Sequence, residues 1–231
     1  MSFYLNIVLL SVLAPLILSF DKKVGFYKHW KTLLPSIFMV AVVFIAFDML
    51  YTGLGVWGFN DDHLIRWNIF NLPVEEVLFF ICIPYASLFL HFVLKSYFPN
   101  LYISKKVSDR LSLTFMVLLL VAVIVYYPKL YTLYASLAVV LALILGIIDK
   151  KNEMGRFFIT FLVVLVPFVL VNGLLTGSFL GNEVVWYNDA ENCGIRFLTI
   201  PAEDFGYAFA MLFFTLWIKG RLETPKKLAN R

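Results

Sequence analysis

Seven stretches of about 20 apolar residues constrain this chain more than any other feature, because about 20 helical residues cross the hydrocarbon core of a bilayer. They occupy residues 3–20, 33–53, 73–94, 111–127, 129–148, 157–176 and 201–218. Only Pro128 and Lys129 separate the fourth from the fifth, and proline there favours a tight hairpin over one long helix. With 61% hydrophobic and 15% charged residues, the chain lacks the polar side chains of a water-facing surface. The sequence predicts an all-α integral membrane protein with about seven transmembrane helices.

The positions of lysine and arginine predict the orientation of these helices. All but three of the 19 basic residues lie in connections 1–2, 3–4 and 5–6 or in the C-terminal tail, and the exceptions are Arg66, Lys129 and Arg196. Basic residues favour the cytoplasmic side, so we expect the N-terminus outside and the C-terminus in the cytoplasm. The same bias accounts for the net charge of +4, and we predict no nucleic-acid partner.

The chain carries an internal repeat, in which three segments of the first half recur in the same order in the second. These pairs are DMLYTG (48–53) with NGLLTG (172–177), VWGFND (56–61) with VWYND (185–189), and NLPVEEVLFF (71–80) with TIPAEDFGYAF (199–209). The repeat maps the first three helices onto the last three. These are four crossings apart, so the two three-helix halves run parallel, and the fourth helix connects them. We predict a first repeat at residues 1–100, a connector at 101–128 and a second repeat at 129–231.

Each half has a Pro-x-Glu-acid motif at the start of its last helix. The motif residues are Pro73, Glu75 and Glu76 in the first half and Pro201, Glu203 and Asp204 in the second. Proline and acids in a first turn make an ordinary helix start. Their recurrence, and the apolar aromatic-rich residues that follow at once, place these acids near membrane depth, where ionisable groups are usually functional. Neighbouring helical residues point about 100° apart, so each motif offers one inward acid. We favour Glu75 and Glu203, because Glu occurs there in both copies, and expect two such acids to meet across the pseudo-axis.

Asp48 lies within the apolar segment FIAFDMLY of the second helix. It is either a proton donor or a residue that hydrogen-bonds one helix to another. Its counterpart in the repeat, Asn172, cannot titrate, which favours the second role for the pair while leaving Asp48 a candidate acid.

Aromatic residues gather near the outer interface, where an aromatic belt is their ordinary role. The alternative is a row of π-faces around a developing cation. Trp57 and Trp186 are the best candidates, because the repeat pairs them. Further candidate substrate-binding residues are Phe59, Tyr187, Asn172, Thr52 and Thr176.

The duplicated three-helix unit with LPVEE (72–76) and IPAED (200–204) resembles the membrane lycopene cyclase family. That family includes heterodimeric bacterial cyclases with one such unit per subunit and the cyclase domain of fungal bifunctional enzymes. The single-chain arrangement is similar to bacterial and archaeal members, which implies a bacterial or archaeal cell membrane. The resemblance implies redox-neutral cyclisation of the ends of lycopene to β-rings, giving γ-carotene and then β-carotene. It also implies Glu75, Glu76, Glu203 and Asp204 as catalytic acids.

Two other functions stay open from the residues alone. A related isoprenoid enzyme, such as a hydratase, would admit water to the same cation, and a proton-coupled transporter would also suit parallel repeats with intramembrane acids. No dinucleotide fingerprint and no metal-ligand spacing of His or Cys is present in the sequence, so we expect no cofactor and no metal. The expected partners are an apolar polyene, membrane lipids and other carotenoid enzymes.

Overall fold

A computed structural model describes residues 2–179 and 181–223. Within them the helices are α1 (Phe3–Leu18), α2 (Trp30–Gly53), α3 (Val74–Tyr97), α4 (Lys105–Val125), α5 (Leu130–Ile148), α6 (Glu153–Leu175) and α7 (Ala202–Glu223). The short elements are η1 (Phe26–His29), η2 (Asp61–His63), β1 (Trp57–Phe59), β2 (Asn68–Ile69), β3 (Leu72–Pro73), β4 (Val185–Tyr187), β5 (Arg196–Phe197) and β6 (Ile200–Pro201).

The helices have the length and composition of membrane spans. Five are long and apolar enough to cross a bilayer, namely α2 extended by η1 and each of α3, α4, α5 and α6. Helix α1 is a shorter apolar helix, and α7 has 22 residues with Glu203 and Asp204 in its first turn. Each predicted run overlaps one helix, and α4 and α5 are separate, so the all-α membrane fold and the predicted hairpin are confirmed.

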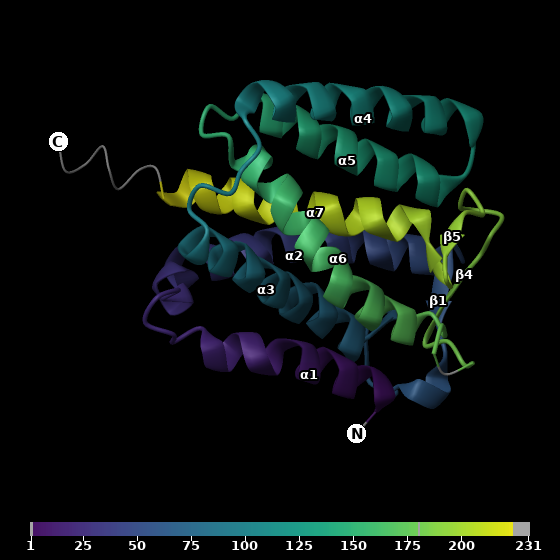
Figure 1. Cartoon of the computed structure of the whole chain (residues 1–231). Helices are drawn as coiled ribbons and strands as arrows, with labels where there is room; N and C mark the ends of the chain where they lie inside the picture. The colour runs from purple at the N-terminus through teal and green to yellow at the C-terminus, as the bar shows by residue number, and fades with distance from the viewer. Residues whose placement is uncertain (1, 180, 224–231) are drawn as a thin grey trace.

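The helices form a bundle in which the α4–α5 hairpin lies on one side and α1 on the other (Figure 1). Between them α2, α3 and α7 run lengthwise, and α6 crosses obliquely. The N-terminus lies at the end of the bundle that carries the short strands, and α7 ends at the opposite end. An odd number of helices along the bundle places the two ends of the chain at opposite ends of it. Which end faces the cytoplasm stays a prediction, and Lys226, Lys227 and Arg231 lie outside the described residues.

The last helix of each half begins directly after a proline that closes a short strand. Pro73 ends β3 before α3, and Pro201 ends β6 before α7. Because proline lacks the N–H that a first helical turn leaves unpaired, it suits both junctions. The acids that follow lie in the first turn of each helix, near the positive end of its dipole.

The two halves repeat the same hairpin ahead of that helix. In β2–β3, Asn68 lies opposite Pro73, and in β5–β6, Arg196 lies opposite Pro201, each 128 residues later. The hairpin tips repeat as well. Phe70 has φ 55° and Leu198 has φ 56°, a left-handed backbone that bulky residues rarely adopt. The backbone of this segment is thus duplicated, while the extent of each repeat unit along the chain stays a prediction.

One predicted residue pairing is wrong. Strands β1 and β4 pair antiparallel with Gly58 opposite Trp186, two residues that are themselves 128 positions apart. The backbone bonds on either side match this spacing, since Asn60 N–H donates to Val184 and Asn188 N–H donates to Val56. Trp57 and Trp186 are 129 residues apart, so pairing them requires a one-residue insertion. The strands keep a constant spacing of 128 and contain no such insertion. The counterpart of Trp57 is therefore Val185, and that of Trp186 is Gly58.

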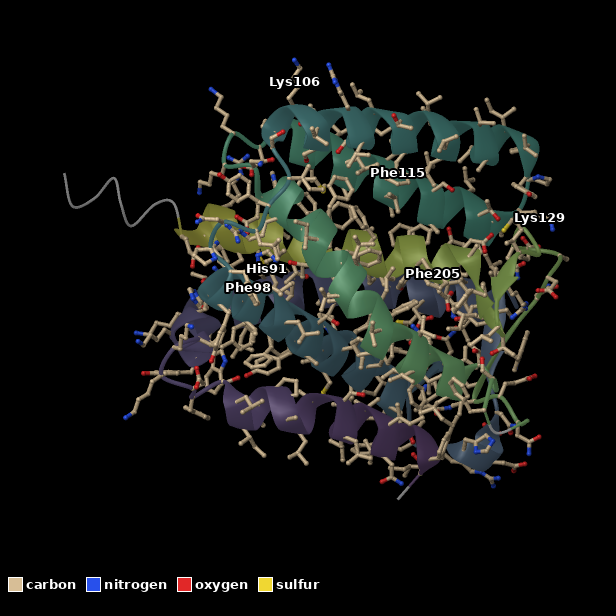
Figure 2. The ribbon with its side chains drawn as sticks, viewed as in Figure 1. His91, Phe98, Lys106, Phe115, Lys129 and Phe205 are labelled. Atoms are coloured by element: carbon tan, nitrogen blue, oxygen red, sulfur yellow. The ribbon has the colours of Figure 1, made fainter. Side chains whose placement is uncertain are left out.

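A buried histidine joins two helices far from the acid motifs. His91 of α3, labelled in Figure 2, is fully buried. Its Nε2 lies 2.9 Å from Glu153 Oε1, and its Nδ1 lies 2.8 Å from Thr160 Oγ1, both on α6. This polar contact ties the first half to the second.

Candidate active site

A cavity of about 80 Å³ lies where the two halves of the bundle meet. Six of the seven described helices contribute lining residues, and α4 contributes none. Three carboxyl side chains line it, Asp48 from α2, Glu76 from α3 and Asp204 from α7. No Lys, Arg or His in the described part of the chain lines it. The cavity wall thus gathers acids from both halves and holds no cation of the described residues.

Tyrosine hydroxyls hold two of these carboxyl groups. Tyr4, in the first helix of the first half, donates to Glu76 Oε2 at 2.5 Å. Tyr131, in the first helix of the second half, donates in the same way to Asp204 Oδ1. Asp204 Oδ2 accepts a second hydrogen bond from Tyr187 at 2.9 Å. The second acid of each motif is therefore oriented by the first helix of its own half.

Asp48 is held differently. Its side chain is only 2% exposed, and the indole Nε1 of Trp57 donates to its Oδ1 at 2.5 Å. Its Oδ2 is buried without a partner among the described residues. Asn172, the predicted counterpart of Asp48, lines the same cavity from α6. Asp48 thus combines a structural hydrogen bond with one free oxygen in a buried position.

The first acid of each motif lies elsewhere. Glu75 Oε1 accepts from the Ser2 hydroxyl at 2.6 Å and from the Ile65 N–H at 2.7 Å. Glu203 Oε1 accepts from the Thr132 hydroxyl at 2.5 Å and from the Cys193 N–H at 2.6 Å. Neither side chain lines the central cavity.

The helical geometry explains this division. Because neighbouring side chains diverge by about 100°, one acid of each motif lines the central cavity, and the other accepts a hydrogen bond from the preceding loop. The sequence favoured Glu75 and Glu203 as the inward acids, but Glu76 and Asp204 are the ones that line the cavity. The choice depends on how α3 and α7 are rotated in the bundle, which a single motif does not reveal.

Comparison with known proteins identifies the family of this chain. The family model described as lycopene cyclase matches residues 1–94 and 128–220, most of the chain. This chain belongs to the lycopene cyclase family. Every residue that lines the cavity falls within one of the two matched segments, and α4 lies between them. Searches of curated proteins and of solved structures found no match.

Membership of the lycopene cyclase family supports an enzyme of cyclase type that acts on carotenoid ends within a membrane. Of the four aromatic residues predicted to bind substrate, three line the cavity and one does not. Trp57, Phe59 and Tyr187 line the cavity, whereas Trp186 does not and is 40% exposed. A Cβ on Gly58 would lie 2.4 Å from the Trp186 ring, so the indole packs over this glycine and away from the cavity.

The two predicted threonines also differ. Thr176 lines the cavity of this cyclase-family protein, and its hydroxyl donates to the Asn172 carbonyl at 2.8 Å. Thr52 does not line it, and its hydroxyl is buried without a partner among the described residues. The repeat therefore brings only one member of this pair to the site.

Sequence reasoning named Tyr187 but missed three other tyrosines of the cavity. Tyr4, Tyr131 and Tyr207 all line the cavity, and the Tyr207 hydroxyl is buried without a partner in the part of the chain that the structure describes. A signal was present, because a tyrosine near the start of the first helix recurs in both halves. Tyr207 follows Asp204 by three residues, which places the two on one helix face.

A hydrogen-bond network in the loop after β4, outside the helices, lies beside Tyr187. Asp189 accepts from Arg196 at 2.5 Å and from Asn192 at 3.0 Å. The hydrogen bonds from Asn192 and Arg196 lower the pKa of Asp189 below its ordinary value. The Arg196 guanidinium also lies 5.8 Å from the centre of the Tyr187 ring.

Proposed function

We propose that this protein closes the ends of lycopene to β-rings by redox-neutral acid catalysis, giving γ-carotene and then β-carotene. The observation that carries the proposal is the meeting of Asp48, Glu76 and Asp204 in one buried, aromatic-lined cavity without a cation from the described residues. Burying three unpaired negative charges together is costly. Such a cavity therefore favours carboxyl groups that carry a proton, and an alkene needs a proton to start cyclisation.

The reaction begins with proton transfer from a carboxyl O–H to C2 of the terminal C1=C2 alkene. The electron pair of C5=C6 then attacks the tertiary cation at C1, which forms the C1–C6 bond and moves the cation to C5. Loss of the C6 proton to a base places a double bond at C5=C6 and completes the β-ring. One proton enters and one leaves, so no oxidant or reductant is needed.

The hydrogen bonds suggest which acid does what. Both oxygens of Asp204 accept tyrosine hydroxyls, the pattern of an ionised carboxylate, which only accepts. Asp204 is therefore our proposed base and counter-charge to the cation. Asp48 has a free oxygen that can carry the donated hydrogen, and Glu76 is the second proton-carrying group. Glu75 and Glu203 act as positioning residues that fix the starts of α3 and α7.

The aromatic lining suits the cationic intermediate. Trp57, Phe79, Phe80 and Tyr207 line the cavity together with the acids, and the face of an aromatic ring attracts a cation. They also exclude water, which would trap the cation as a tertiary alcohol. The cavity is smaller than the roughly 150 Å³ cavity that admits benzene. Ring closure there therefore requires lining side chains to move.

The test is product analysis in a lycopene-accumulating host, followed by the purified protein in deuterated buffer. We expect γ-carotene and β-carotene, with one deuterium at C2 for each ring formed, because the donor carboxyl exchanges with solvent. A tertiary alcohol in place of a ring would identify a hydratase. Rings formed without deuterium would refute proton donation from an exchangeable carboxyl group.

A further inference from the structure

A second cavity lies on the opposite face of α7 from the candidate active site. It is a groove of about 620 Å³, within the roughly 300–1,000 Å³ range of small-molecule sites. Its walls come from α4, α5, α6 and α7. Adjacent residues of α7 face the two cavities, since Asp204 lines the central one and Glu203 lines the groove.

The groove is apolar along its length. On α4 its lining runs from Leu111 to Tyr126, about 22 Å at 1.5 Å per residue. Phenylalanines line it from three helices, among them Phe115 and Phe205, both labelled in Figure 2. No Lys, Arg or His of the described residues lines it.

One buried carboxyl oxygen stands at the motif end of the groove. Glu203 is 6% exposed, and its Oε1 is occupied by Thr132 and Cys193, which also line the groove. Its Oε2 is buried without a partner within residues 2–179 and 181–223. A buried oxygen left without a hydrogen bond is unfavourable, and this one lies in the wall of an apolar channel.

The apolar lining and the Glu203 carboxyl group indicate which kind of ligand fits the groove. A phospholipid with its phosphate at the motif end of the groove would place that phosphate beside the Glu203 carboxyl group, and no Lys, Arg or His of the described residues lines the groove. A hydrocarbon without a headgroup meets no such conflict, and flat phenyl rings pack well along a flat conjugated chain. We propose that the groove binds a linear polyene, the acyclic substrate of the proposed reaction, with one end against Glu203. This inference rests on the proposed function.

The groove is specific to a chain that carries α4. The α4 wall falls in residues 95–127, between the two segments that match the family. The central cavity needs only the matched segments, whereas the groove needs the connector as well. It would therefore hold the apolar substrate beside the active site in this fused arrangement.

The test compares two phenylalanine substitutions on neighbouring residues of α4. Ala122 lines the groove, whereas Val121 is 50% exposed and does not line it. In the full-length protein in nanodiscs, lycopene binding is titrated by its absorbance in an Asp204→Asn background, which prevents turnover. We expect Ala122→Phe to weaken one class of lycopene sites about tenfold, because it overfills the groove. We expect Val121→Phe to leave binding unchanged.

Further measurements separate the possible outcomes. Equal thermal unfolding of the two variants would show that Ala122→Phe still folds. Equal lycopene binding by both variants would overturn the inference, as would mass spectra in which Ala122→Phe displaces a phospholipid in place of lycopene. Equal lycopene binding by the two variants, combined with normal β-carotene formation by the protein that keeps Asp204, would refute polyene binding in the groove and leave the proposed cyclisation intact. Binding that is sensitive to Ala122→Phe, combined with no ring formation by the protein that keeps Asp204, would refute the proposed cyclisation alone.

Discussion

Replacing Asp204 with Asn and Glu203 with Gln separates the two acids of one motif. The residues are adjacent, each is 6% exposed, and each substitution replaces one carboxyl oxygen with an amide nitrogen. The amide introduced by Asp204→Asn would keep an oxygen to accept the Tyr131 hydroxyl, so the fold should persist. The two substitutions differ in the cavity that each side chain lines.

The expected magnitudes follow from these positions. If Asp204 accepts the C6 proton, Asp204→Asn removes a general base, which is worth about 10²–10⁴-fold in rate, or about 3–5 kcal/mol of barrier. Glu203→Gln retains the oxygen that Thr132 and Cys193 bind. We expect it to lower the rate less than about tenfold, by way of substrate binding.

The assay is the initial rate of γ-carotene formation from lycopene in proteoliposomes, resolved by liquid chromatography. Glu183→Gln is the matched control, because Glu183 is exposed and distant in sequence from both motifs. Gel filtration of each variant checks that it is folded. A Glu203→Gln variant more impaired than Asp204→Asn would refute the assignment and restore the first acid of the motif as the catalytic one.

Three further predictions concern the supporting structure. Gly58→Ala should lower thermal stability by about 1–3 kcal/mol, since its Cβ would lie 2.4 Å from Trp186; a Trp186→Ala background should remove most of that loss, and an unchanged loss would contradict the packing. His91→Leu should destabilise the protein by about 1–3 kcal/mol, because it leaves Glu153 without its bond from a buried partner; unchanged unfolding in detergent would disprove this tie. Because the pKa of Asp189 is lowered in the fold, its contribution to stability is present above its unfolded value of about 3.9 and is lost as the pH falls through the folded pKa. Asp189→Asn should therefore flatten the acid limb of the curve of unfolding temperature against pH, and an unaltered limb would refute the link.

The sequence alone determined the class of fold and the acids that we propose as functional. A helix must cross about 30 Å of hydrocarbon with its backbone satisfied internally, so the lengths of the apolar runs were enough to predict seven helices. The proline and acids of both motifs predicted where α3 and α7 begin, because helix starts obey local rules. The recurrence of those acids pointed to function before any geometry was known.

Only the tertiary structure decided which side chains meet. Rotation of α3 and α7 in the bundle turned Glu76 and Asp204 toward the cavity, and it turned Glu75 and Glu203 away. Pairing of β1 with β4 set Trp186 over Gly58 and removed it from the site. The tyrosines reach their acids across about 70 residues of sequence. Helix rotation, strand register and long-range contacts are fixed by packing among all elements together, and no local pattern of residues encodes them.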